Sequence, residues 1–246
     1  MTDPPNDQAS SEFETTHWSL VVAAGERHSP VADEALAALC DRYWQPLYAY
    51  VRRTGRSLHD AQDLTQQFFV KLLDKEYLRV ADSERGRFRS FLLAALKHFL
   101  ANERKSQRAQ KRGGGQRILS WDFALAESAL ASEPSAPMTP AMLFDRQWAV
   151  LLLETVLERL EAELTARGKQ ATFHQLKPLL AGDAQPYQQV AESLGTNEAA
   201  VKMAVHRMRR RYRELLREEI AQTVADPADV DDELKELFGI LSAKNA

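Results

Sequence analysis

Apolar side chains recur at helical spacing along the first part of the chain, after a short apolar run at Trp18. The clearest segment is 33–53, where these positions fall three or four residues apart and form one face of a helix. They are Leu36, Leu39, Tyr43, Leu47, Tyr50 and Val51. Proline lacks an N–H and collides with the preceding turn, so Pro46 is expected to kink or divide this helix.

Two further helices are predicted in the same half. Ser57 and Asp60 have the spacing of a helix cap, and the helix they start, which runs to about residue 74, turns three apolar side chains inward: Leu64, Phe68 and Leu72. A helix over 87–111 presents a second apolar face, made by Phe88, Leu92, Ala95 and Phe99. Its back half, 102–112, is rich in arginine and lysine and is too polar to pack.

Glycine and proline separate the first half from the second. The glycine run 113–115 predicts a flexible linker, and the prolines of 133–140 predict a stiffer one. Four apolar residues between them are expected to lie in a groove of a partner or of one of the domains: Trp121, Phe123, Leu125 and Leu130. Helical spacing resumes over 140–167 and 173–180. Because no strand-like alternation appears, the predicted fold class is all-α.

The most informative segment, 187–206, has the pattern of two helices joined by a tight turn. Gly195 would supply the positive φ of the turn, and Asn197 would cap the second helix. Small or apolar side chains fall where the helices must touch: Val190, Ala191, Leu194, Val201 and Ala204. The basic run that follows would attract a phosphate backbone. The pattern favours a DNA-binding helix-turn-helix over a helical hairpin with a solvated cationic face.

These patterns predict two helical domains joined by a flexible linker, the second a winged-helix-like four-helix domain that contains the helix-turn-helix. The predicted boundaries are 1–14 for a disordered N-terminus, 15–112 for the first domain, 113–140 for the linker, 141–224 for the second domain and 225–246 for a tail. The tail has an acidic start and then a short amphipathic helical pattern. Such a helix persists only when docked. It either extends the core or lies over the basic residues 207–213 and restrains DNA binding.

Composition sets limits without choosing a function. The 246 residues are 44% hydrophobic, which is enough for two small cores. A net charge of −3 hides basic stretches at 104–117 and 202–217 and an acidic one at 225–236. A single cysteine, Cys40, excludes a disulfide within the chain, and no signal pattern or membrane-spanning run is present. We therefore expect a soluble cytoplasmic protein.

Motifs for catalysis or metal binding are missing from the sequence. The six histidines have no metal-binding spacing, and the glycines at 113–115 lack the lysine and hydroxyl of a phosphate loop. The acidic stretch that begins at Asp229 has Leu234 where a calcium loop requires glycine. We expect no catalytic residue, no metal and no cofactor, so the chain is not predicted to be an enzyme.

Two separate segments resemble one protein family. The sequence LHDAQDLTQQFFVKLL at 58–73, followed by GRFRSFLLAALKHFLAN at 86–102 and its basic tail, is similar to the promoter-melting domain of bacterial extracytoplasmic-function (ECF) sigma factors. Residues 187–216 resemble the C-terminal helix-turn-helix domain of the same family. The resemblance covers roughly 30–112 and 145–220, in the family's order and with a linker between. Subgroups with longer chains share the THWSLVV opening.

The resemblance implies a factor that binds core RNA polymerase, melts promoter DNA and dissociates. The polymerase would bind the outer face of the second helix, at Asp60, Asp63, Gln66 and Gln67. The −10 element of the promoter would be contacted by Arg85, Arg87, Phe88, Asn102, Arg104, Lys105 and Arg108. The −35 element would be read by Thr196, Asn197, Glu198, Lys202, His206, Arg207 and Arg210.

Several points stay open after the resemblance. Met203 and Ala204 stand where the family has serine and arginine, so the base preference is not given. The segment 167–186 lacks the family's Leu-Pro-x-x-x-Arg pattern, which leaves contact with the polymerase flap open. The main alternative is a helix-turn-helix regulator that acts without polymerase, and a helical scaffold comes third. An anti-sigma factor or a regulatory kinase remains open as a further partner, with Thr65, expected on the helix surface, as a phosphorylation site.

Overall fold

The computed structural model describes Trp18 and residues 30–73, 86–106, 121–131, 138–181 and 186–242. Across these residues the protein is all-α, as predicted, and strand-like pairing is limited to one isolated bridge between Arg87 and Val224. The long helices are α2 (Pro30–Arg53), α3 (Leu58–Leu73), α4 (Phe88–Ser106), α6 (Pro140–Ala166) and α9 (Glu198–Ala221). The shorter ones are α5 (Phe123–Ala131), α7 (Gln170–Ala181), α8 (Tyr187–Ser193) and α10 (Val230–Ser242). The predicted disordered residues 1–14 and the glycines 113–115 lie outside the described residues.

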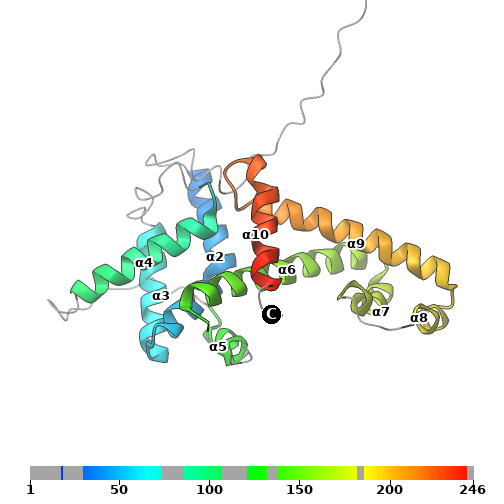
Figure 1. Ribbon diagram of the computed structural model, residues 1–246, viewed down its shortest axis with the longest axis horizontal. Helices are drawn as coiled ribbons and strands as arrows, with labels where there is room; N and C mark the ends of the chain where they lie inside the picture. The colour runs from blue at the N-terminus through cyan, green and yellow to red at the C-terminus, as the bar shows by residue number, and fades with distance from the viewer. Residues whose placement is uncertain are drawn as a thin grey trace, which may run out of the picture.

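Helix α2 is kinked where the sequence predicted a break. Tyr43 has the non-helical angles φ −113° and ψ 21°, three residues before Pro46. The proline ring would collide with a regular turn at this point, so the helix bends there. The predicted inner faces of α3 and α4 are buried against α2, including Leu64, Phe68 and Phe99. Three helices thus form the first half of the core (Figure 1).

Helix α5 was not predicted, but two of the four apolar side chains around it pack as expected. The rings of Trp121 and Trp44 stack with centroids 5.0 Å apart, and Phe123 contacts Trp44 edge-on at the same distance. The indole N–H of Trp121 donates a hydrogen bond to Asp41 at 3.0 Å. The groove that receives this segment therefore belongs to the first half of the protein. Leu125 is wrongly predicted to lie in it, because 59% of Leu125 is exposed.

Helix α6 connects the two ends of the protein. It packs on α2 near its start and on α9 further along, and Figure 1 shows it running from the α2–α4 group toward α7 and α8. Trp148 of α6 stacks on Tyr43 of α2, with ring centroids 4.1 Å apart, and also contacts Phe88 of α4 at 6.0 Å. Buried residues of both halves form one continuous cluster. In this structure the two predicted helical units therefore lie in direct contact.

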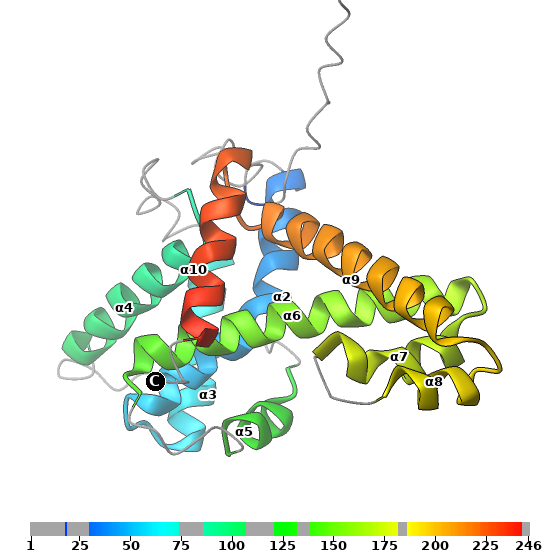
Figure 2. The same cartoon turned by 45° about the vertical axis from the view of Figure 1, so that its right-hand side comes forward.

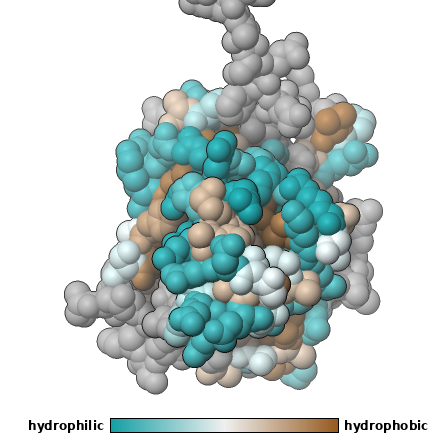
Figure 3. Space-filling model, turned by 90° about the vertical axis from the view of Figure 1, so that its right-hand side faces the viewer, coloured by the Kyte–Doolittle hydropathy of each residue, from teal (hydrophilic) through white to brown (hydrophobic). Residues whose placement is uncertain are grey.

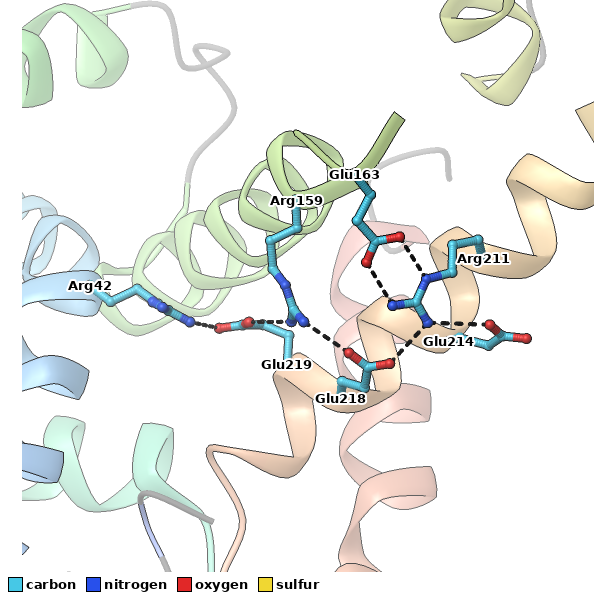
Figure 4. Close-up of polar contacts among 7 residues, drawn as sticks. All are labelled: Arg42, Arg159, Glu163, Arg211, Glu214, Glu218 and Glu219. Atoms are coloured by element: carbon cyan, nitrogen blue, oxygen red, sulfur yellow. Dashed lines mark hydrogen bonds and ion pairs between the residues drawn. The ribbon is translucent and has the colours of Figure 1, made fainter. Parts of the chain in front are cut away.

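A buried carboxylate ties α9 to the rest of the core. Glu219 is 1% exposed, and its oxygens accept hydrogen bonds from the Tyr43 hydroxyl at 3.0 Å and from Arg159 at 3.2 Å. Arg42 of α2 forms an ion pair with the same carboxylate (Figure 4). Burial and the neighbouring Glu219 charge raise the pKa of Tyr43, so its hydroxyl stays protonated and donates. Three helices are thus joined by one polar group.

The predicted tail helix forms and is docked. After a short turn of 3-10 helix at Pro227–Asp229, helix α10 lies across α6 and the end of α9 (Figure 2). Leu237 is buried, whereas Phe238 is half exposed. The proposal that the tail lies over residues 207–213 is wrong, because its acidic residues pair elsewhere, with Arg87, Arg89 and Arg217.

Candidate nucleic-acid interface

The predicted turn between α8 and α9 has the geometry that its residues favour. Gly195 has φ +62°, which a side chain would strain. The N–H of Thr196 bonds to the carbonyl of Ala191 at 2.9 Å and closes the turn. Asn197 then caps α9, because its side-chain oxygen accepts the N–H of Ala200 at 2.9 Å. Local sequence alone therefore fixes how the start of α9 is presented.

Loss of this cap should weaken the start of α9. Asn197→Ala leaves the N–H of Ala200 without its side-chain partner, so the free energy of unfolding should fall by about 1 kcal/mol. Chemical denaturation measures the change. Asn197→Ser, which can cap, should lose much less, and equal losses in both variants would contradict the capping role.

Every residue predicted to read the −35 element is exposed on the first turns of α9 or in the turn before it: Thr196, Asn197, Glu198, Lys202, His206, Arg207 and Arg210. Lys202 pairs with Glu198 at 2.6 Å, and this hydrogen bond raises the lysine pKa. Arg210 pairs with Glu214 at 3.0 Å. Figure 3 shows this end of the molecule as largely hydrophilic. These exposed pairs are weak, so the cations can exchange partners with phosphate.

Other arginines of the same basic run hold α9 in place. Arg211 binds Glu163 of α6 at 2.7 Å and also contacts Glu214 and Glu218 of α9 (Figure 4). Its hydrogen bond to Glu163 lowers the pKa of that carboxyl. Arg209 donates to the carbonyl of Leu179 in α7 at 2.6 Å. This division could not be predicted from local sequence, because the acceptors lie on the distant helices α6 and α7.

Met203 and Ala204, where the chain departs from the family pattern, differ in their exposure to solvent. Met203 is 56% exposed, next to Lys202, whereas Ala204 packs against the core. An apolar group therefore stands on the exposed face of α9 among polar ones. Apolar side chains in such positions can contact the methyl group of thymine.

The proposed polymerase-binding face of α3 is open to solvent. Asp60 and Asp63 are exposed, and Gln66 and Gln67 are half buried. The Ser57 hydroxyl accepts the N–H of Asp60 at 3.1 Å and donates to its carboxylate at 2.8 Å, so the predicted cap forms. The buried face of the helix lies on the other side.

Thr65 was predicted on the helix surface, and this is wrong. Its side chain is fully buried, and its hydroxyl donates to the carbonyl of Ala61 at 2.7 Å. Phe69 lies one turn further on the same face, and Trp121 covers it with ring centroids 4.8 Å apart. A kinase could not reach the Thr65 hydroxyl in this conformation.

The predicted −10 residues are only partly accessible. Phe88, proposed as a wall that stacks on a base, is instead fully buried, with its ring centroid 5.0 Å from that of Trp18. Arg87 is half buried and pairs with Glu233 and Glu236 of α10. Asn102 is exposed on α4. Arg85 and Arg108 lie outside the described residues, as do the side chains of Arg104 and Lys105.

Comparison with known proteins gives one match. Residues 39–110, which include most of α2 and all of α3 and α4, match the family model of Sigma-70 region 2. Neither the curated proteins nor the solved structures contain a match to the chain. The match supports a sigma-70 family factor and covers the segment in which the sequence resembles a promoter-melting domain. Within the described residues, no helix is long and apolar enough to cross a membrane.

Proposed function

We propose that the protein is a sigma factor of the extracytoplasmic-function type, which binds core RNA polymerase and directs it to promoters. The observation that carries the proposal is the sigma-70 region 2 match over 39–110. A second support is the helix, capped turn and exposed basic helix of 187–213, which lie in the order that two-element promoter recognition requires. The protein performs no covalent chemistry in this role, and its cytoplasmic location is part of the proposal.

Each surface has one task in the proposal. The exposed acids of α3, Asp60 and Asp63, bind a basic surface of the polymerase. The first turns of α9 enter the major groove of the −35 element as a helix-turn-helix, where early side chains reach base edges and later ones grip phosphates. Arg87 and the basic end of α4 contact the melted −10 strand, where their positive charge holds the single-stranded backbone.

A pull-down with purified core RNA polymerase tests the proposal. The sigma-factor account expects the full chain to be retained by core polymerase and to be needed for promoter-specific transcription. The regulator alternative expects tight binding of the isolated protein to duplex DNA, with no retention by core polymerase. That second result would contradict the proposal.

Asp60→Ala combined with Asp63→Ala should weaken polymerase binding without changing helical content. Both carboxylates are exposed, and exposed ion pairs contribute at most about 1 kcal/mol each, so the loss should be modest and larger at low salt. Binding is measured by titration with core polymerase. Glu34→Ala, which removes an exposed acid from α2, is the matched control and should bind as wild type does. Unchanged affinity in the double variant would refute this assignment.

A further inference from the structure

The segment after α9 covers the start of α4, where the proposed −10 residue Arg87 lies. The N–H of Phe88 donates to the carbonyl of Thr223 at 2.8 Å, and the N–H of Ala225 donates to the carbonyl of Gly86 at 2.6 Å. A Cβ atom built on Gly86 would lie only 2.8 Å from a carboxylate oxygen of Asp229. The Asp229 carboxylate therefore fills the space beside Gly86, and a nucleotide that approaches from this side would have to displace it.

Carboxylates of α10 form ion pairs with the arginines beside this backbone. Glu233, which is 1% exposed, pairs with Arg87 at 3.1 Å and with Arg89 at 2.9 Å. Glu236 pairs with both arginines as well, 2.6 Å from Arg89. Burial acts to raise the pKa of Glu236, but the two guanidiniums outweigh it and lower the pKa, so the carboxylate is ionised at neutral pH. An anion bound to Arg87 would have to displace these groups.

The covering segment is anchored to the helix-turn-helix half of the protein. It continues directly from α9, and Val230 and Leu237 of α10 are buried against α6 and α9. Its acidic side chains reach α4 on the other side (Figure 2). We call residues 222–242 the C-terminal strap. The strap therefore connects the end of α9 to the start of the surface proposed for the −10 element.

We propose that the C-terminal strap covers the start of α4 in the free protein, and that it must release Arg87 and the backbone at Gly86 before the −10 strand can bind there. This inference rests on the proposed function. Opening requires rupture of the Arg87 and Arg89 ion pairs and of the two backbone hydrogen bonds. The strap would thereby suppress promoter binding by the protein alone.

A reversible crosslink tests whether opening is needed. Gly86→Cys with Asp229→Cys places two thiols at the tightest contact of the strap. Cys40 should not interfere, because it is buried and burial raises its pKa. The oxidised protein is mixed with core RNA polymerase and a library of genomic fragments. It should give at most about one tenth of the transcript that the reduced protein gives, because the form with a released strap is no longer populated. Reduction should restore transcription. Equal activity of oxidised and reduced protein would overturn the proposal.

A milder variant tests the strap without polymerase. Glu236→Gln removes one partner of Arg87 but leaves the buried Glu233 in place. Its affinity for a mixed-sequence single strand of about 20 nucleotides should rise, by up to about fivefold at 0.1 M salt if one phosphate contact is gained. Asp232→Asn, an exposed acid of α10 that pairs only locally with Lys235, is the control and should bind as wild type does.

The two experiments separate the inference from the function on which it rests. If wild-type and reduced protein both fail to bind core polymerase, the proposed function fails, and the single-strand measurement still decides whether the strap restrains Arg87. If Glu236→Gln binds the single strand no better than Asp232→Asn does, the strap does not restrain DNA binding, whatever the polymerase result.

Discussion

Arg89→Met is expected to lower the free energy of unfolding by about 3 to 5 kcal/mol, because it removes the buried partner of the buried Glu233 carboxylate and leaves it only the more exposed Arg87. Arg89 is 4% exposed and bonds to Glu233, which is 1% exposed, and to Asp145 of α6. Burial acts to lower the pKa of Arg89, but the hydrogen bonds and charges of the surrounding carboxylates raise it overall, so the guanidinium is charged. Urea denaturation measures the loss.

A neighbouring arginine and a double variant control this prediction. Arg87→Met removes a side chain that is 26% exposed and whose partners keep other contacts, so it should cost about 1 kcal/mol or less. Adding Glu233→Leu to Arg89→Met removes the stranded carboxylate, and most of the lost stability should return. If Arg89→Met destabilises no more than Arg87→Met, the buried pair does not hold the strap in place.

Lys202→Ala combined with Arg207→Ala should reduce affinity for duplex promoter DNA roughly 60-fold at 0.1 M salt, because each neutralised phosphate contributes about eightfold there. Both residues are exposed on the first half of α9, and neither side chain packs in the core. In a plot of the logarithm of the binding constant against the logarithm of the salt concentration, the slope should become less steep by about two units. Titrations at several salt concentrations measure both quantities.

The matched control for this pair is Lys235→Ala. Lys235 is also exposed but lies on α10, away from the surface of α9 proposed for the −35 element, so its loss should leave the salt slope for duplex DNA unchanged. The melting temperature should stay near the wild-type value in both variants, since none of these side chains is buried. A wild-type slope in the double variant would show that this face of α9 does not grip phosphate.

Local patterns in the sequence predicted the helices and their caps well. The faces of α3 and α4 follow from apolar spacing, and the kink at Tyr43 follows from Pro46. The start of α9 follows from Asn197 and Gly195, because capping and positive φ depend only on adjacent residues. The exposed basic residues of α9 could also be predicted, since that face has no apolar periodicity.

Contacts between distant segments could not be predicted in this way. Arg89 and Glu233 are 144 positions apart, and neither residue type signals the other. Phe88 has the spacing of a core residue, yet the resemblance placed it in a base-binding wall, and its packing on Trp148 decided the outcome. Thr65 is buried on the same face of α3 as Phe69, which packs against Trp121 from a segment expected to be a linker. Tertiary packing decides the outcome in all three cases.

The central claim is that this chain gives core RNA polymerase its promoter specificity. Run-off transcription with purified core polymerase on a genomic fragment library measures this directly. We expect discrete transcripts that appear only when the chain is added and that weaken with Lys202→Ala and Arg207→Ala. Transcripts that are the same with and without the chain, together with no retention of the chain by core polymerase, would contradict the account.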